Sequence, residues 1–207
     1  MYENYRDIEQ HYNKEKEQTN KILVLTGLSG CGKDFLLHEL KKSGHIKENI
    51  SVYSFGQKLF EAVKEKLQLN SRDQLRDVPD YKLVEGVNLA LEQIIREQPV
   101  ILNTHVVHKQ GDIIACRPEF ERKLDPASYA FVWTDPEQIV AWRHDDETRN
   151  RAAESVSKVA LDQSIALIVT ARLAKWNGSA FHTLENRTDN AAANVDLLSQ
   201  YLEESGL

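Results

Sequence analysis

Residues 27–33 read GLSGCGK, a glycine-rich turn that closes on a lysine. This spacing fits the pattern GxxxxGK, in which glycines let backbone N–H groups wrap phosphate oxygens and the lysine adds a mobile positive charge. An apolar run at residues 22–25 precedes the turn, and a helical pattern follows it from residue 34. A glycine turn without a ligand is the alternative, but the strand before and the helix after favour a phosphate-binding loop. The candidate residues for binding a nucleoside triphosphate are Gly27, Ser29, Gly30, Cys31, Gly32 and Lys33.

The residue after Lys33 is Asp34, at a position where the pattern usually has Ser or Thr to hold Mg²⁺. A carboxylate near the start of a helix could simply complement the helix dipole. However, a triphosphate would repel Asp34 unless a cation lay between them, which favours Asp34 as a Mg²⁺ ligand. A second acid is expected at the end of a neighbouring strand, where this chain has Asn103. We therefore take Asp34 and Asn103 as the candidate metal residues.

Secondary structure must hold these residues together. From residue 21 onward, the sequence predicts strands and helices in alternation. Continuous apolar strands between amphipathic helices imply a parallel sheet that is covered on both faces. The sequence predicts a three-layer αβα sandwich with a five-stranded parallel sheet, the fold of P-loop NTPases and kinases. The expected strands are 22–25, 50–55, 100–107, 129–133 and 180–184, and the expected helices are 34–42, 57–67, 71–77, 81–98, one from 136, 155–176 and 191–202.

Length and composition bound the domain organisation. With 207 residues, of which 41% are hydrophobic, the chain is long enough for one well-buried domain and short for two. We expect one α/β domain over residues 21–207 and a polar extension over residues 1–20. The extension carries aromatic and apolar residues at roughly helical spacing, which fits either a short helix lying on the domain or on a partner, or a solvated tail. These residues are Tyr2, Tyr5, Ile8 and Tyr12.

Charge and cysteine content exclude some classes of partner. The formal net charge is −6 with no basic block, which argues against binding of duplex DNA. No apolar run has the length of a membrane span, so no membrane partner is expected. Two cysteines are too few for a disulfide framework, which favours a reducing, cytoplasmic setting. The sequence leaves the oligomeric state open, a homo-oligomer included.

Several motifs in order along the chain resemble one family. KILVLTGLSGCGK, the NTH of the third strand, the DP of VWTDPEQIVAWR and the TRNR of DDETRNR are similar to archaeal-type adenylate kinases, within the P-loop nucleoside monophosphate kinases. The similarity runs from about residue 21 to about residue 205. It implies ATP as the phosphate donor, Mg²⁺ as the cofactor and a nucleoside monophosphate, AMP as the first guess, as the acceptor.

Two departures from the family pattern coincide at the metal. The family has Ser or Thr at position 34 and Asp at position 103, so one carboxylate has changed sides and the total charge is kept. The GKD ending also resembles other small-molecule kinases, including phosphomevalonate kinase and a phage deoxynucleotide kinase. A kinase for a deoxynucleotide or another phosphorylated small molecule is therefore the first alternative. A nucleotide-binding regulatory protein with little transferase activity is the second.

The resemblance assigns a lid near residues 143–153 that closes over the phosphates. Its arginines Arg143, Arg149 and Arg151 would stabilise the migrating phosphoryl group, because a guanidinium stays charged and grips phosphate oxygens with two donors. The spacing to Arg143 is one residue short of the family pattern. The alternative is a solvated connection in which these arginines pair with the acidic residues 145–147.

On the acceptor side, Arg76 matches a basic position of the family and is the best candidate for the acceptor phosphate. A phosphate acceptor needs no general base, because its second pKa is about 6. This favours a phosphorylated acceptor over a hydroxyl. The acceptor candidates are Gly56, Gln57, Arg72, Arg76, His105 and Lys109. Gln57 replaces an acidic residue that the family commonly carries.

The resemblance places the adenine of ATP after the fifth strand, at Asn186 and Arg187. Trp133, Trp142 and Trp176 are expected in the core rather than as platforms for base stacking.

Overall fold

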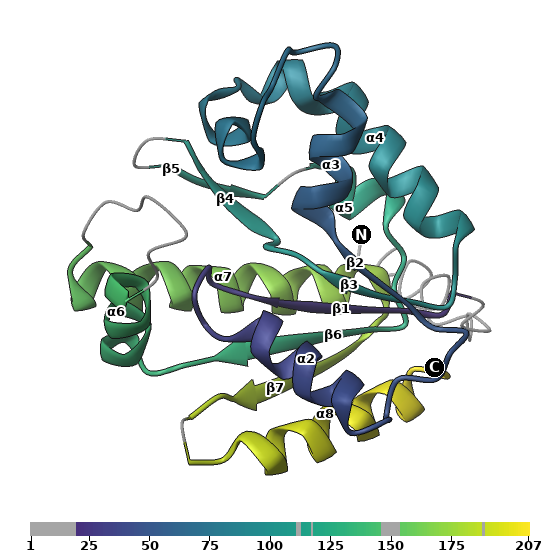
Figure 1. Ribbon diagram of the computed structural model, residues 1–207, viewed down its shortest axis with the longest axis vertical. Helices are drawn as coiled ribbons and strands as arrows, with labels where there is room; N and C mark the ends of the chain where they lie inside the picture. The colour runs from purple at the N-terminus through teal and green to yellow at the C-terminus, as the bar shows by residue number, and fades with distance from the viewer. Residues whose placement is uncertain (1–19, 111–112, 117, 146–153, 188) are drawn as a thin grey trace, which may run out of the picture.

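The computed structural model describes residues 20–110, 113–116, 118–145, 154–187 and 189–207. Its centre is a five-stranded sheet with the strand order β2-β3-β1-β6-β7, and every neighbouring pair is parallel (Figure 1). The strands are β1 (Ile22–Gly27), β2 (Ser51–Ser54), β3 (Val100–Asn103), β6 (Ser128–Trp133) and β7 (Ala180–Glu185). The expected five-stranded parallel sheet is confirmed.

Helices cover both faces of this sheet. Helices α2 (Lys33–Lys42) and α8 (Ala191–Glu204) pack on one face, as Figure 1 shows below the sheet. The other face is covered by α3 (Phe55–Val63), α4 (Asp80–Arg96), α5 (Pro118–Lys123) and α7 (Val156–Asn177). A 3-10 helix, η1 (Arg72–Asp77), joins α3 to α4, and α6 (Pro136–Asp145) follows β6. The result is the predicted αβα sandwich.

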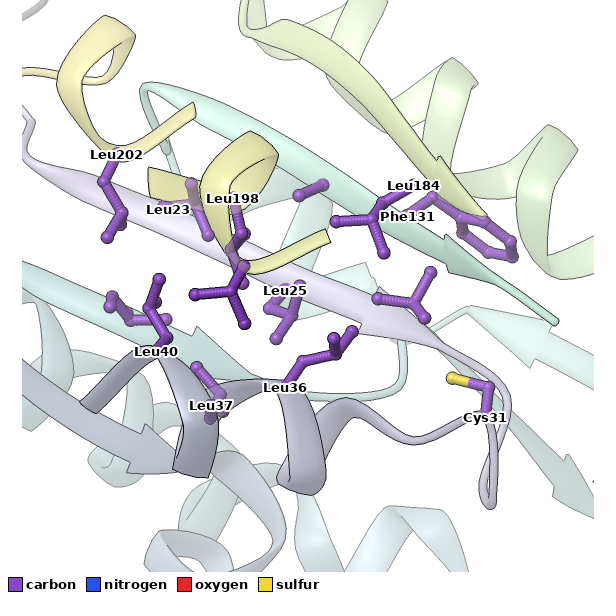
Figure 2. Close-up of a cluster of buried hydrophobic side chains, with 14 of the residues drawn as sticks. Leu23, Leu25, Cys31, Leu36, Leu37, Leu40, Phe131, Leu184, Leu198 and Leu202 are labelled. Atoms are coloured by element: carbon purple, nitrogen blue, oxygen red, sulfur yellow. The ribbon is translucent and has the colours of Figure 1, made fainter. Parts of the chain in front are cut away.

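The central strand β1 explains why the phosphate loop is held firmly. All six of its residues are buried, and alternate side chains point to opposite faces of the sheet. Leu23 and Leu25 join a core cluster with α2 and α8, whereas Ile22 and Val24 join the cluster beneath α3 and α4. Figure 2 shows the first cluster, with Cys31 of the loop at its end. Each fully buried Leu or Ile contributes about 1.5–3 kcal/mol, so both ends of the loop are anchored in core.

The third predicted strand is longer in the sequence reading than in the structure. It was expected over residues 100–107, but β3 ends at Asn103, and Thr104 donates its backbone N–H to the carbonyl of Leu25. The chain then leaves the sheet, and β4 (Val107–Gln110) pairs antiparallel with β5 (Ile113–Cys116) in a separate two-stranded sheet. The sequence does not reveal this break between β3 and β4, because the residues on both sides of it are apolar and belong to two different strands. Helix α5 was also not predicted.

The edge strand β2 is tied to the end of α4. Tyr53 donates its hydroxyl to the carboxylate of Glu97, and the Lys58 ammonium lies 4.0 Å from the centre of the Tyr53 ring. The hydrogen bond lowers the pKa of Glu97 and raises the pKa of Tyr53, because it joins the ionised acid to the neutral phenol.

Among the described residues, no helix combines the length and the apolar character that crossing a membrane requires.

Candidate active site

The phosphate loop depends on glycine at two positions for two separate reasons. Gly27 and Gly32 have φ angles of +144° and +87°, in the region that side chains disfavour. A Cβ on Gly27 would lie 2.6 Å from the carbonyl oxygen of Val132, and one on Gly32 would lie 2.2 Å from the Nδ2 of Asn186. Conformation and space therefore both require glycine at these two positions.

Buried side chains fix the middle of the loop. The carbonyl of Cys31 accepts hydrogen bonds from the hydroxyl of Thr134 at 3.0 Å and from the Nδ2 of Asn186 at 2.9 Å. Both donors are at most 3% exposed. The sequence reading missed Thr134, although its place directly after β6 puts it beside the loop. The loop is thus shaped by the protein itself before any ligand arrives.

Lys33 lies inside the loop, and its side chain is only 6% exposed. Its ammonium donates to the carbonyls of Gly27 at 3.1 Å and Leu28 at 2.8 Å. The Nδ1 of His105 lies 2.7 Å from the same Gly27 carbonyl and 3.4 Å from the Lys33 ammonium. His105, predicted on the acceptor side, is therefore positioned at the phosphate loop.

The two candidate metal residues are in direct contact. Asn103 donates its Nδ2 to the Oδ1 of Asp34 at 2.5 Å. The contact arises because β3 pairs with β1 in the register that sets Asn103 opposite Leu25, so both strands end beside the loop. A carboxylate and an amide at the mouth of a phosphate loop fit Mg²⁺, which takes one or two carboxylates and completes its shell with phosphate and water oxygens. The described residues hold no group of three or more His, Cys, Asp or Glu side chains suited to a metal.

Arg143, near the end of α6, contacts the loop at Ser29. Its Nε and Nη2 donate to the carbonyl of Ser29 at 3.0 and 2.7 Å, and its Nη1 pairs with Glu154 at 2.5 Å. The acid that pairs with Arg143 is therefore Glu154, which the sequence reading did not single out. Residues 146–153 of the predicted lid, with Arg149 and Arg151 among them, lie outside the described residues.

A pocket of about 330 Å³ opens next to the loop. Its lining residues are Gly32, Phe35, Trp142, Asn186, Arg187 and Ala191. The structure thus brings Asn186 and Arg187 together with the loop. The core prediction is wrong for Trp142, which lines this pocket, and for Trp176, which is 61% exposed on α7. Phe35 of α2 is 50% exposed and also lines this pocket.

The acceptor candidates whose side chains are described are half-buried or exposed to solvent. The Cδ of Arg72 approaches Gly56, where a Cβ would be 3.7 Å away. Arg76 pairs with Asp73 at 3.8 Å, and both side chains are 51% exposed. Gln57, next to Gly56, donates to Glu61 at 3.0 Å. Lys109 belongs to β4, and its side chain is outside the described part of the chain.

A parallel sheet in this strand order, with a glycine loop between β1 and α2 closing on a lysine, defines a P-loop kinase. A family model described as an AAA domain matches residues 26–160, more than half of the chain, and the protein belongs to that family.

Curated relatives and solved structures agree with this class. The chain is 27% identical to the adenylate kinase of Thermoplasma acidophilum, over 83% of this chain and 94% of that enzyme. It is 25% identical to the adenylate kinase of Methanothermobacter thermautotrophicus, over 88% of this chain and all of that enzyme. The shikimate kinase of Bacteroides thetaiotaomicron has a similar fold, with a TM-score of 0.54 at 14% identity, covering 88% of this chain and 98% of that one.

Proposed function

We propose that the protein transfers the γ-phosphate of ATP to a nucleoside monophosphate, with AMP as the first candidate, in a Mg²⁺-dependent reaction. One observation carries the proposal: the Lys33 ammonium and the Asp34–Asn103 pair converge on the mouth of one preformed loop. The adenylate kinase relatives, matched over 94% and 100% of their length, support a nucleotide as acceptor.

On the donor side, the loop amides and Lys33 bind the β- and γ-phosphates of ATP. Lys33 is already desolvated, so its charge acts on the phosphates through little water. The pocket beside the loop takes the base, which stacks on the rings of Trp142 and Phe35 that line it, with Asn186 and Arg187 at its rim. Transfer is then a matter of positioning and cationic stabilisation, to which Arg143, Arg149 and Arg151 contribute from the lid.

Asp34 and Asn103 hold the metal in this proposal. Asp34 binds Mg²⁺ directly or through a water molecule, and Asn103 holds the Asp34 carboxylate in place through its amide. When bound, Mg²⁺ would neutralise phosphate charge and orient the terminal phosphate. The carboxylate that the resembled family carries at position 103 is thereby replaced by the one at position 34.

The acceptor binds between β2, the start of α3 and η1. Arg76 and Arg72 bind its phosphate, and Gly56, next to Arg72, gives the acceptor room to approach the backbone. Gln57 and Lys109 complete the acceptor set, whereas His105 lies beside Lys33 at the phosphate loop. No general base is required of any of them, since an acceptor phosphate is already ionised near neutral pH.

A kinase for another phosphorylated small molecule is the second candidate, favoured by Asp34 and Gln57, which depart from the nucleotide kinase pattern. One panel separates the candidates: ADP release from ATP and Mg²⁺ is measured with AMP, other nucleoside monophosphates, deoxynucleotides and phosphorylated metabolites. Stimulation by a nucleotide supports the proposal, and stimulation by a metabolite alone supports the second candidate. ATP binding without acceptor-stimulated turnover would contradict both and favour a regulatory protein.

A further inference from the structure

The carbonyl group of Cys31 is held from outside the phosphate loop. It accepts hydrogen bonds from the hydroxyl of Thr134 and from the Nδ2 of Asn186. The peptide unit between Cys31 and Gly32 is planar and trans, so its N–H points away from its C=O. Hydrogen bonds to the Cys31 carbonyl therefore also set the direction of the Gly32 N–H, which is a donor at the N-terminal end of α2.

Thr134 is held in turn by a side chain of α7. The Oε1 of Gln163 accepts from the backbone N–H of Thr134 at 3.1 Å, and the Nε2 of Gln163 donates to the backbone C=O of Thr134 at 2.8 Å. Both residues are 0% exposed. A reversed amide would place donor against donor and acceptor against acceptor, so the backbone of Thr134 allows the Gln163 amide one orientation.

The place of Gln163 on α7 makes its amide a firm support. Val159 and Ala166, four residues before it and three after it, are buried in the same core cluster as the leucines of α2. They lie on the same side of the helix as Gln163. An amide among such apolar neighbours costs free energy unless both of its polar groups are paired. The Gln163 amide is therefore held by the core on one side and by Thr134 on the other.

Thr134 needs this support because it lies between two elements. Strand β6 ends at Trp133, and helix α6 begins at Pro136. Gln163 supplies the partners that the N–H and C=O of Thr134 would otherwise find in a sheet or a helix. These two hydrogen bonds leave the Thr134 hydroxyl to donate to the loop at 3.0 Å. A side chain of α7 thus acts on the phosphate loop through one intervening residue.

We propose that Gln163 is a positioning residue for the donor phosphates and acts on the phosphate loop through Thr134. It fixes the backbone of Thr134, whose hydroxyl in turn fixes the Cys31 carbonyl. The N–H of Gly32 then keeps the direction in which it donates to a bound phosphate. Gln163 itself contacts no phosphate. This inference rests on the donor side of the proposed function, because it takes the loop as the site of the ATP phosphates.

Binding of tripolyphosphate with Mg²⁺ tests the positioning role, since this probe has the phosphates of ATP without the base. Gln163→Met keeps the length of the side chain and removes both hydrogen bonds to Thr134. We expect it to weaken the binding of tripolyphosphate and of ATP by the same factor, about tenfold. Isothermal titration calorimetry measures both affinities. A loss confined to ATP would place the effect at the base and overturn the proposal.

Thr170→Val is the matched control for the loss of a buried hydrogen bond on α7. Thr170 is also 0% exposed, and its hydroxyl donates within the helix, to the carbonyl of Ala166 at 2.7 Å. This variant should lower the midpoint of thermal unfolding and leave both affinities unchanged. If Gln163→Met retains both affinities as Thr170→Val does, the proposal alone is wrong. If the unchanged protein binds neither ligand, the donor side of the proposed function fails, and this proposal fails with it.

A double variant separates the positioning role from a loss of packing. Thr134→Val removes the hydroxyl that reaches the loop, and it should weaken tripolyphosphate binding by a similar factor. Adding Gln163→Met to Thr134→Val should lower the midpoint of thermal unfolding further but change the affinity little, because the contact with the loop is already broken. Effects on affinity that multiply in the double variant would contradict action through Thr134.

Gln163→Glu keeps the proposal testable if Gln163→Met fails to fold. A protonated carboxyl group accepts from the Thr134 N–H and donates to the Thr134 C=O as the amide does, whereas an ionised one has no proton to donate. The tripolyphosphate affinity of this variant, divided by that of the unchanged protein at the same pH, should therefore be near one at low pH and fall as the pH rises. A ratio that does not change with pH would contradict the proposal.

Discussion

The donor side and the acceptor side of the candidate site differ in how far their side chains are buried and how closely they are held by hydrogen bonds. On the donor side, Lys33 is 6% exposed and held by two carbonyls, and buried groups fix the Cys31 carbonyl. On the acceptor side, Arg76 is half exposed and pairs only loosely with Asp73 at 3.8 Å. An exposed pair at this distance contributes little to stability. The fold thus determines the shape of the donor site, whereas the acceptor cations stay available to a ligand that supplies its own anion.

The largest expected effect comes from removing the donor-side charge. Lys33→Met should lower turnover by ~10²- to 10³-fold, the usual range for losing one preorganised group that stabilises the transition state. Lys41→Met, an exposed change on the same helix, is the control and should leave turnover unchanged. Steady-state ADP release measures both, and a Lys33→Met protein of normal activity would break the donor side of the comparison.

The metal pair offers the next largest effect. Asp34→Ser should raise the Mg²⁺ concentration for half-maximal activity by about 10- to 100-fold, since the carboxylate is the charged member of the pair. Asn103→Asp alone replaces the hydrogen bond between residues 103 and 34 by a contact between two carboxylates. Their like charges repel each other, so this variant should also have reduced activity. Combining the two changes restores one carboxylate, so activity should exceed that of the worse single variant. If it does not, the carboxylate exchange is wrong.

A pair of glycine variants separates backbone strain from loop crowding. Gly44→Ala meets no atom within 4 Å but has φ +79°, so it should cost about 1–2 kcal/mol from strain alone. Gly32→Ala has the same strain and also drives a methyl against Asn186, so its cost should exceed that of Gly44→Ala and ATP binding should weaken. Chemical unfolding and ATP titration measure the two terms. Equal costs would show that the loop is less tightly held than the structure indicates.

The residues around the phosphate loop show how much of the candidate site could be predicted from the sequence. The loop, Asp34 and Asn103 were predictable because a motif fixes their spacing and a parallel sheet aligns strand ends. The two hydrogen bonds to Cys31 were not, because Thr134 and Asn186 lie 103 and 155 residues from it and only the strand order β1-β6-β7 brings them there. Trp142 was expected in the core rather than as a platform for base stacking, but it lines the pocket beside the loop. Pattern alone cannot distinguish a core wall from the wall of a pocket.

On the acceptor side, Arg76→Ala should raise the KM for the acceptor by about tenfold, the value of one charge-assisted hydrogen bond, and leave the affinity for ATP unchanged. Asp73→Ala, which removes only the loose partner, is the control and should leave the KM at or below its normal value. Separate titrations with ATP and with the acceptor make the distinction. A loss of ATP affinity in Arg76→Ala would show that the two sides are not independent.

The smallest expected effect concerns the edge strand next to the acceptor side. Tyr53→Phe should destabilise the fold slightly near neutral pH, because it removes the hydrogen bond to Glu97. The lowered pKa of Glu97 means that this stabilisation is lost as the pH falls through that pKa, and the raised pKa of Tyr53 means that it is lost as the pH rises past the ordinary phenol range. The difference between Tyr53→Phe and the unchanged protein should therefore shrink at both ends. Tyr81→Phe, at an exposed tyrosine, should show no such profile.

The destination of the phosphate tests the central claim most directly. ATP labelled at the γ-phosphate is incubated with the protein, Mg²⁺ and AMP, and the label is located by chromatography. The proposed function predicts that the label appears in the β-phosphate of ADP formed from AMP, with one ADP also formed from each ATP used. Label recovered as inorganic phosphate, at a rate that does not depend on AMP or on any other acceptor, would contradict it.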